Sequence, residues 1–149
     1  MSEFWRRVSF GGVLVAVILL CAAIIFQIWI SYKIEDVGPG ARPALQSVLR
    51  TYFLSKVTGD YWENELLRQA KNVAKLPLKE RLDFYRIVIL QCGLDSYRVL
   101  LFIEIVGVDA APLHQHLLAF KQSAQYRYLS SSQQKALDDW LIETKVISR

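Results

Sequence analysis

The histidines are the first candidates for chemistry, because histidine is the most frequent metal ligand and general base in proteins. The chain has two, His114 and His116, in a segment whose apolar spacing predicts a helix. Side chains two positions apart are separated by about 200° around a helix, whereas a shared metal ion favours the i, i+4 spacing. The same region offers one cysteine, Cys92, which leaves a zinc site short of ligands. We therefore expect no metal site.

Motifs for nucleophilic catalysis and for phosphate binding are both missing from the sequence. Serine and histidine occur together, but no Gly-x-Ser-x-Gly segment presents a serine for attack. The adjacent glycines Gly11 and Gly12 lie in the apolar N-terminal stretch, and the other glycines are isolated turn residues. The sequence thus predicts neither an enzyme nor a cofactor-binding protein.

Glu104 stands out because it is the single charged residue within the apolar run 99–108. A buried carboxylate must be paired or neutralised, and Arg86 and Arg98 are candidate partners for a salt bridge inside the domain. A second interpretation makes Glu104 the charged centre of a partner-binding surface. A third makes it the acid of a small envelope-acting hydrolase, although such chemistry usually uses a second carboxylate.

Aromatic residues are numerous for a small domain, and the adjacent pair Tyr61 and Trp62 must point to different sides of a helix. Exposed aromatic side chains often mark interfaces with other proteins. Together with Glu104 and Trp140, this pair makes up our set of candidate partner-binding residues. An aromatic-rich core is the alternative that the pattern leaves open.

Charge and cysteine content exclude two further classes of protein. The net charge of +4 is spread along the chain, and Arg6 with Arg7 is the only local basic cluster. Nucleic-acid-binding domains usually carry a basic stripe with interleaved aromatics, so nucleic acid is not expected as a partner. Cys21 lies in the N-terminal apolar stretch and Cys92 in a helical pattern, which excludes a disulfide framework. We interpret Cys92 as a small buried hydrophobic residue.

The first element that must position these residues is an uncharged stretch, residues 8–30. At ~1.5 Å per residue it is long enough to cross the roughly 30 Å hydrocarbon core of a bilayer. Trp5 precedes it, and Trp29 and Tyr32 lie near its other end, where aromatic residues gather at membrane interfaces. Gln27 is hydrated by lipid headgroups or donates to a partner helix. We interpret this stretch as one transmembrane helix.

A cleaved signal peptide is the main alternative to a retained anchor. Its apolar region is shorter and ends at a small-x-small cleavage site. Here apolar residues continue past Cys21, and Leu20 stands where a lipoprotein signal has glycine or alanine. Arg6 and Arg7 flank the N-terminal side, which favours a cytoplasmic N-terminus over residues 1–7. The C-terminal domain is then predicted in the periplasm of a cell with an inner membrane.

The rest of the chain predicts a linker over residues 31–43 and an all-α domain over residues 44–149. Glycine and proline in the linker stop the transmembrane helix. Apolar residues then recur at helical spacing and predict a compact bundle of about five to six short helices, in which stacked helical hairpins remain an alternative. The expected boundaries are an end at Gly59, a capping box of Asp60 and Glu63, a start at Pro77, an end at Gly93, a helix from Pro112 to about Tyr128, and a capping box of Ser131 and Gln134.

These observations favour a non-enzymatic accessory or structural subunit of a membrane or envelope protein complex. A single helix anchors it, and its helical domain binds other membrane or envelope proteins. The first alternative is a membrane-tethered chaperone, inhibitor or immunity protein that binds a single client. The second is the hydrolase with Glu104 as its acid.

Overall fold

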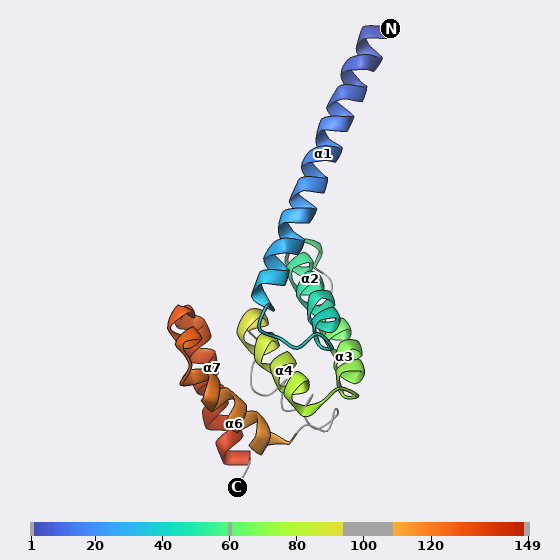
Figure 1. Ribbon diagram of the computed structural model, residues 1–149. Coiled ribbons are helices and arrows are strands. Elements are labelled where there is room, and N and C mark those ends of the chain that lie inside the picture. Colours follow the sequence, from blue (N-terminus) through green and yellow to red (C-terminus); the bar gives the residue numbers. More distant parts are fainter. Residues whose placement is uncertain (1, 60, 94–108, 148–149) are drawn as a thin grey trace. The chain divides into compact units, whose positions relative to one another are not determined.

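The computed structural model describes residues 2–59, 61–93 and 109–147, and all regular elements in these ranges are helices (Figure 1). The chain forms two compact units, Met1–Glu35 and Asp36–Arg149. The predicted all-α class, with one long apolar helix before a bundle of short helices, is confirmed.

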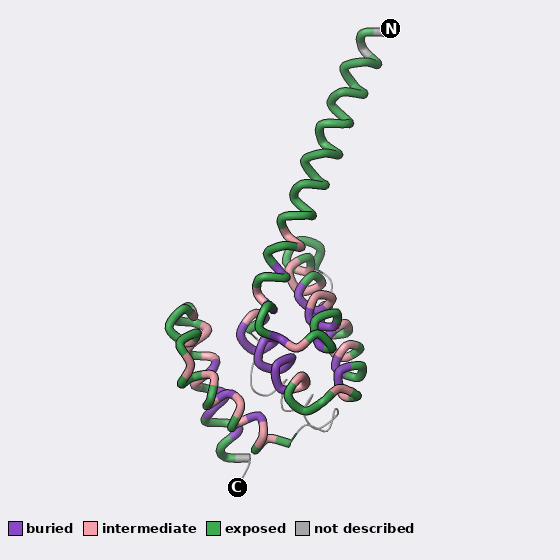
Figure 2. Tube along the Cα trace, viewed as in Figure 1, coloured by how far each residue is buried: buried purple, intermediate pink, exposed green. Residues whose placement is uncertain are grey.

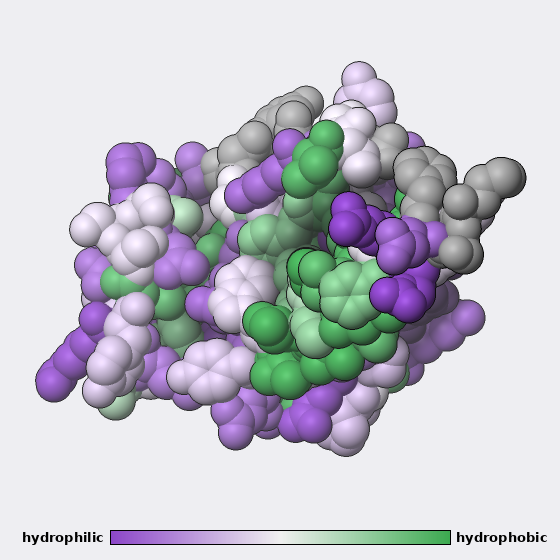
Figure 3. Space-filling model, turned by 90° about the horizontal axis from the view of Figure 1, so that it is seen from above, coloured by the Kyte–Doolittle hydropathy of each residue, from purple (hydrophilic) through white to green (hydrophobic). Residues whose placement is uncertain are grey.

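The first unit consists of α1, Ser2–Lys33. Its side chains are exposed along almost the whole length, although most of them are large and apolar (Figure 2). Hydrophobic side chains accordingly gather over α1 in the space-filling view, beside a hydrophilic group (Figure 3). Within the described part of the chain, Trp5–Lys33 is the one segment long and apolar enough to cross a membrane. Its length and composition fit a spanning helix and a signal sequence equally well.

The second unit begins with a pair of helices, α2 (Arg42–Thr58) and α3 (Trp62–Val73). Gly59 ends α2 in the left-handed conformation, with φ of 76°, and its N–H donates to the Ser55 carbonyl at 2.8 Å. This is the C-terminal position that favours glycine, as the sequence predicted. The buried residues of both helices recur at helical spacing. They are Ala44, Leu45, Val48 and Leu49 on α2 and Leu66, Ala70 and Val73 on α3.

The central element of this unit is α4, Leu78–Cys92, which is buried at every position from Leu82 to Leu90. A helix is buried on all sides when other elements cover every side of it. The helix α4 is buried in this way because it contacts α2, α3, α6 and α7. Gly93 ends α4 with φ of 59°, at the predicted position.

The C-terminal part contains α6 (Ala110–Lys121), the 3₁₀ helix η1 (Ala124–Tyr128) and α7 (Ser131–Ile147). The sequence predicted one helix from Pro112 to Tyr128, whereas the structure interrupts it at Ser123. The backbone of Ser123 is extended, and its hydroxyl donates to the Phe120 carbonyl at 2.6 Å. The Ser123 N–H donates to the same carbonyl at 3.0 Å, so backbone and side chain of this serine together close the end of α6.

Of the two predicted capping boxes, one differs from the structure, and the other, which includes Asp60, stays a prediction. On α7 the box lies one residue earlier: the Gln133 N–H donates to the Ser130 hydroxyl, and the Ser130 N–H donates to the Gln133 amide oxygen at 3.0 Å. The predicted pair, Ser131 and Gln134, has the same residue types and spacing as the observed pair. The sequence alone therefore could not show which pair forms the box. On α3 the N-cap is Tyr61, which makes no side-chain capping bond; Asp60 lies outside the described residues.

The connection between α1 and α2 is shorter than the predicted linker and is part of the folded domain. Val37 is 1% exposed and Ala41 is fully buried. The Arg42 Nε donates to the Val37 carbonyl at 2.8 Å. A Cβ atom on Gly38 would lie 2.8 Å from a carboxylate oxygen of Glu80, so glycine allows this part of the connection to lie against α4.

Candidate interaction surfaces

A buried ionic cluster fixes the connection and α6 to the central helix. The Arg86 guanidinium lies 2.8 Å from a carboxylate oxygen of Asp36 and 3.6 Å from one of Asp83. It also stacks over the Phe120 ring, 4.6 Å from its centroid. His116 Nε2 lies 3.1 Å from Asp83 Oδ1. Arg86 and Asp83 are 5% and 4% exposed, so the cluster orders three segments from inside the domain.

The Asp83 carboxyl stays ionised in this cluster. Burial alone would raise its pKa, but the His116 ring and the Arg86 guanidinium lower it further than burial raises it, so the net pKa is below the ordinary value. A buried carboxylate paired with a guanidinium stabilises the fold only while both charges are present. The cluster is therefore structural: it orients α4 and α6.

The two histidines contact different partners. His114 Nδ1 lies 2.9 Å from the Thr144 hydroxyl on α7, whereas His116 faces Asp83 on α4. Among the described residues no three histidine, cysteine or acidic side chains are placed to hold a metal ion. Both cysteines are free thiols, and burial raises the pKa of Cys92 to about 12.

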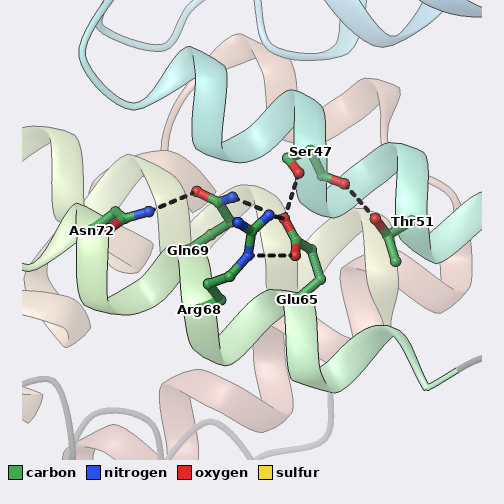
Figure 4. A network of polar contacts seen from close by, with 6 residues as sticks. All are labelled: Ser47, Thr51, Glu65, Arg68, Gln69 and Asn72. Atoms are coloured by element: carbon green, nitrogen blue, oxygen red, sulfur yellow. Dashed lines mark hydrogen bonds and ion pairs between the residues drawn. The ribbon is translucent and has the colours of Figure 1, made fainter.

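A second polar network joins α2 to α3 (Figure 4). Glu65 accepts hydrogen bonds from the Ser47 hydroxyl, from the Gln69 amide at 2.8 Å and from the Arg68 guanidinium at 2.7 and 2.8 Å. The bond from Arg68 contributes most to lowering the pKa of Glu65 to about 2. These bonds hold the two helices in register from the surface side.

The candidate partner-binding residues separate into three groups. Tyr61 is 82% exposed, and Trp62 is half-buried with its ring edge against Tyr52, 5.0 Å between centroids. Trp140 is 1% exposed and belongs to the core, because α7 turns this face towards α6 and α4. Its indole is therefore unavailable to a partner in this fold. Glu104 lies outside the described residues, and its three interpretations stay predictions.

Apolar side chains on either side of the turn between α2 and α3 are exposed, which the sequence did not reveal. Leu54 is 50% exposed and Val57 is 87% exposed at the end of α2. Lys56 lies over the rings of Tyr52 and Phe53, 4.8 and 5.5 Å from their centroids. We call Leu54, Lys56, Val57 and Tyr61 the junction surface, because they flank the turn between α2 and α3.

The outer face of α7 is a second exposed apolar surface. Ile142 and Val146, one helical turn apart, are 63% and 67% exposed. The opposite side of the same helix carries the buried residues Leu137, Trp140, Leu141 and Thr144. A surface helix normally has one apolar stripe that faces the core. The second stripe has no such explanation within the described part of the domain.

A cavity of about 390 Å³ lies where α2, α4 and α7 meet. Its lining is mixed, with the Tyr52 ring beside amides, hydroxyls and Gly93. Gln133 spans part of it by donating from its amide to the Leu90 carbonyl at 3.2 Å. These contacts place the start of α7 beside the end of α4. Near the end of α7, Thr144 contacts His114 of α6, whose His116 faces Asp83 near the start of α4, so α4 and α7 run in opposite directions.

The predicted anchor residues lie along α1. Trp5, Arg6, Arg7 and Tyr32 are exposed, and Gln27 is half-buried. Trp29 stacks on Phe26 with 6.3 Å between centroids, and Lys33 lies 5.5 Å from the centre of the Trp29 ring. The C-terminal end of α1 thus combines aromatic rings with a cation.

The ionic cluster is the main feature that sequence reasoning missed. A signal was present, because Asp83 and Arg86 stand three positions apart within the otherwise apolar run 82–90. Charged residues in such a run must be paired. Their partners Asp36 and His116 are distant in sequence, and helical spacing alone could not identify them.

The chain matches no protein family, and neither the curated proteins nor the solved structures contain a significant match to it.

Proposed function

We propose that this chain is a single-pass membrane protein that α1 retains in an inner membrane, with Arg6 and Arg7 in the cytoplasm and the helical domain in the periplasm. In this proposal the domain is a non-enzymatic accessory subunit that docks onto another protein of the membrane or envelope. The length and apolar surface of α1 support the anchor, and its flanking arginines support the orientation.

The outer face of α7 carries the proposal of a protein partner. Exposed isoleucine and valine side chains on successive turns give a continuous apolar strip, and a partner helix or sheet would remove it from water. The partner's contact also has a defined place along the domain. Because α7 begins beside the end of α4 and runs in the opposite direction, Ile142 and Val146 lie towards the other end of α4.

The test is co-purification of the full chain from its native membrane in mild detergent. A photo-crosslinking amino acid at Ile142 should trap one partner, and Ile142→Glu should abolish a detergent-stable complex of fixed stoichiometry. Gln125, exposed on η1, is the control position for both the crosslinker and the glutamate substitution. A complex unaffected by Ile142→Glu rules out this face as the docking site.

The orientation requires a separate measurement. Reporter enzymes active only in the periplasm or only in the cytoplasm can be fused after Arg149. Activity of the periplasmic reporter is expected. Activity of the cytoplasmic reporter alone would reverse the proposed topology, and recovery of a shortened chain without α1 would identify a cleaved signal sequence.

A further inference from the structure

The cavity where α2, α4 and α7 meet lies entirely within the second unit, Asp36–Arg149. Its volume of about 390 Å³ falls within the range of ~300–1,000 Å³ that is typical of small-molecule sites. The space continues past the end of α4, because a Cβ atom on Gly93 would meet no other atom within 4 Å. The cavity is therefore large enough for a small organic molecule.

Tyr52 gives the cavity an aromatic wall, and its neighbours hold the ring in place. The rings of Phe53 and Trp62 lie edge-on to it, with 5.1 and 5.0 Å between centroids. The Lys56 ammonium lies 4.8 Å from its centre. A side chain that is already ordered loses little further freedom when a ligand binds, which lowers the entropic cost of binding. Tyr52 thus offers a preformed apolar surface with a hydroxyl at its edge.

The polar groups of the wall are amides and hydroxyls. The Ser130 and Ser132 hydroxyls lie 3.0 Å apart. The Gln133 amide donates to the Leu90 carbonyl at 3.2 Å and is held in position by this bond. Among the described residues, nothing hydrogen-bonds to the side-chain amide of Gln91, which leaves both its donor and its acceptor available to a ligand.

The described residues that line the cavity are all uncharged, and this selects the class of ligand. An ionic ligand would lose hydration here without gaining an opposite charge from the wall. A ligand with several hydroxyl groups suits the wall, because hydroxyls and amides both donate and accept hydrogen bonds. A sugar ring adds C–H groups that can pack against the Tyr52 ring.

The compact shape of the site favours a sugar over a peptide. An extended peptide spaces its hydrogen-bonding groups along the chain, at ~3.3 Å per residue, and needs a long groove. A sugar carries its hydroxyls around a single ring. The lining residues come from the ends of α2 and α4 and the start of α7, and they surround one space rather than follow a line.

We propose that this cavity binds a neutral saccharide unit, with the Tyr52 ring against the C–H groups of the sugar and the Gln91 amide on its hydroxyls. The site is separate from the proposed docking face on α7. The cavity uses Ser132 and Ala136 at the start of that helix, whereas Ile142 and its neighbours lie towards the other end. The domain then binds a protein and a sugar at different places.

Saturation-transfer difference NMR of the full chain tests the proposal. The chain is kept in a zwitterionic detergent, because glycoside detergents would compete for the site, and micelles without protein supply the blank. Methyl β-glucoside and cellobiose are the neutral probes, at millimolar concentrations. Methyl β-glucuronide carries a carboxylate in place of the hydroxymethyl group, and acetyl-trialanine amide is a neutral peptide. Saturation of the two neutral sugars is expected, and the glucuronide and the peptide should bind more weakly.

A substitution that fills the cavity locates the binding site. Ala136→Phe should weaken sugar binding about tenfold or more, because the ligand loses its space. Ala119→Phe is the matched control, since Ala119 is exposed on α6 and does not line the cavity. Gln91→Leu keeps the size of the side chain and should weaken binding about three- to tenfold, the effect of one hydrogen bond. Tryptophan fluorescence through thermal unfolding shows whether each variant is folded, because Trp140 is buried.

Four results would overturn the proposal. The first is the absence of saturation of both neutral sugars by the folded chain. The second is sugar binding that Ala136→Phe and Gln91→Leu leave unchanged, or that Ala119→Phe weakens equally, because the sugar would then bind elsewhere. The third is tighter binding of the glucuronide than of the glucoside, which would assign the site to an anion near Lys56. The fourth is saturation of the peptide and of neither sugar, which would identify a peptide site.

Discussion

Replacing Arg86 by methionine is the sharpest test of the buried cluster. Methionine fills much of the space of the arginine side chain but supplies no charge, so the buried Asp83 carboxylate loses its guanidinium partner. Removing one partner of a buried ion pair costs about 3 kcal/mol or more in free energy of unfolding. This is a large share of the ~5–15 kcal/mol that stabilises a typical domain. The expected fall in Tm is roughly 10 °C or more.

Thermal unfolding in detergent provides the assay. Near-ultraviolet circular dichroism and tryptophan fluorescence are suitable signals, because Trp140 is 1% exposed in the folded domain. Far-ultraviolet signals are less useful, since α1 contributes helix that need not melt with the domain. Arg68→Met is the matched control. The Arg68 side chain is 67% exposed in its pair with Glu65, and loss of a solvent-screened surface pair should change the Tm far less than loss of the buried pair.

A double-mutant cycle decides whether the buried charge is the cause. Asp83→Asn removes the carboxylate, so Arg86→Met in that background should cost far less than it does alone. Equal costs in the two backgrounds would refute the reasoning and would assign the effect of Arg86 to its contacts with Asp36 and Phe120.

The same cluster predicts a pH dependence with a definite sign. The pKa of Asp83 is lowered by folding, so its contribution to stability is complete above the unfolded pKa and is lost as the pH falls through the folded pKa. Arg86→Met removes one cation and raises the folded pKa. The variant should therefore lose less stability on acidification than the parent, as measured by urea unfolding across acidic pH.

Three further predictions concern the rest of the domain. Leu137→Ala should lower the free energy of unfolding by about 2–5 kcal/mol in urea titrations, because Leu137 is fully buried. Ser130→Ala should cost about 1 kcal/mol, since it removes the acceptor of the capping box on α7; Ser131→Ala should cost less, and equal costs would contradict the observed register. The pKa of Glu65 is lowered from 4.5 to about 2, so its stabilising effect should disappear as the pH falls through that interval, and Glu65→Gln should show a smaller change in stability there.

Helical periodicity and glycine positions predicted much of the fold. The ends of α2 and α4 at Gly59 and Gly93 follow from local backbone chemistry, because these residues adopt positive φ where side chains would be strained. The break before η1 and the register of the capping box on α7 were not predicted. Several serine and glutamine residues there satisfy the same short-range rules, and only tertiary contacts select among them.

The interaction surfaces were harder to predict, because exposure depends on which face of each helix the neighbours cover. Tyr61 and Trp140 have similar aromatic character in the sequence, yet one is 82% exposed and the other 1% exposed. Val57 and Ile142 fit core positions by residue type alone. Their exposure follows from the packing of α2 and α7, and local sequence does not encode it.

The contact between Asp36 and Arg86 also determines how mechanical load enters the domain. Asp36 is the first residue of the second unit, and it pairs with Arg86 on the central helix α4. A force applied to the chain at Asp36 would therefore be delivered to α4 rather than to a peripheral helix. The packed helices around α4 would share that force until the ion pair breaks.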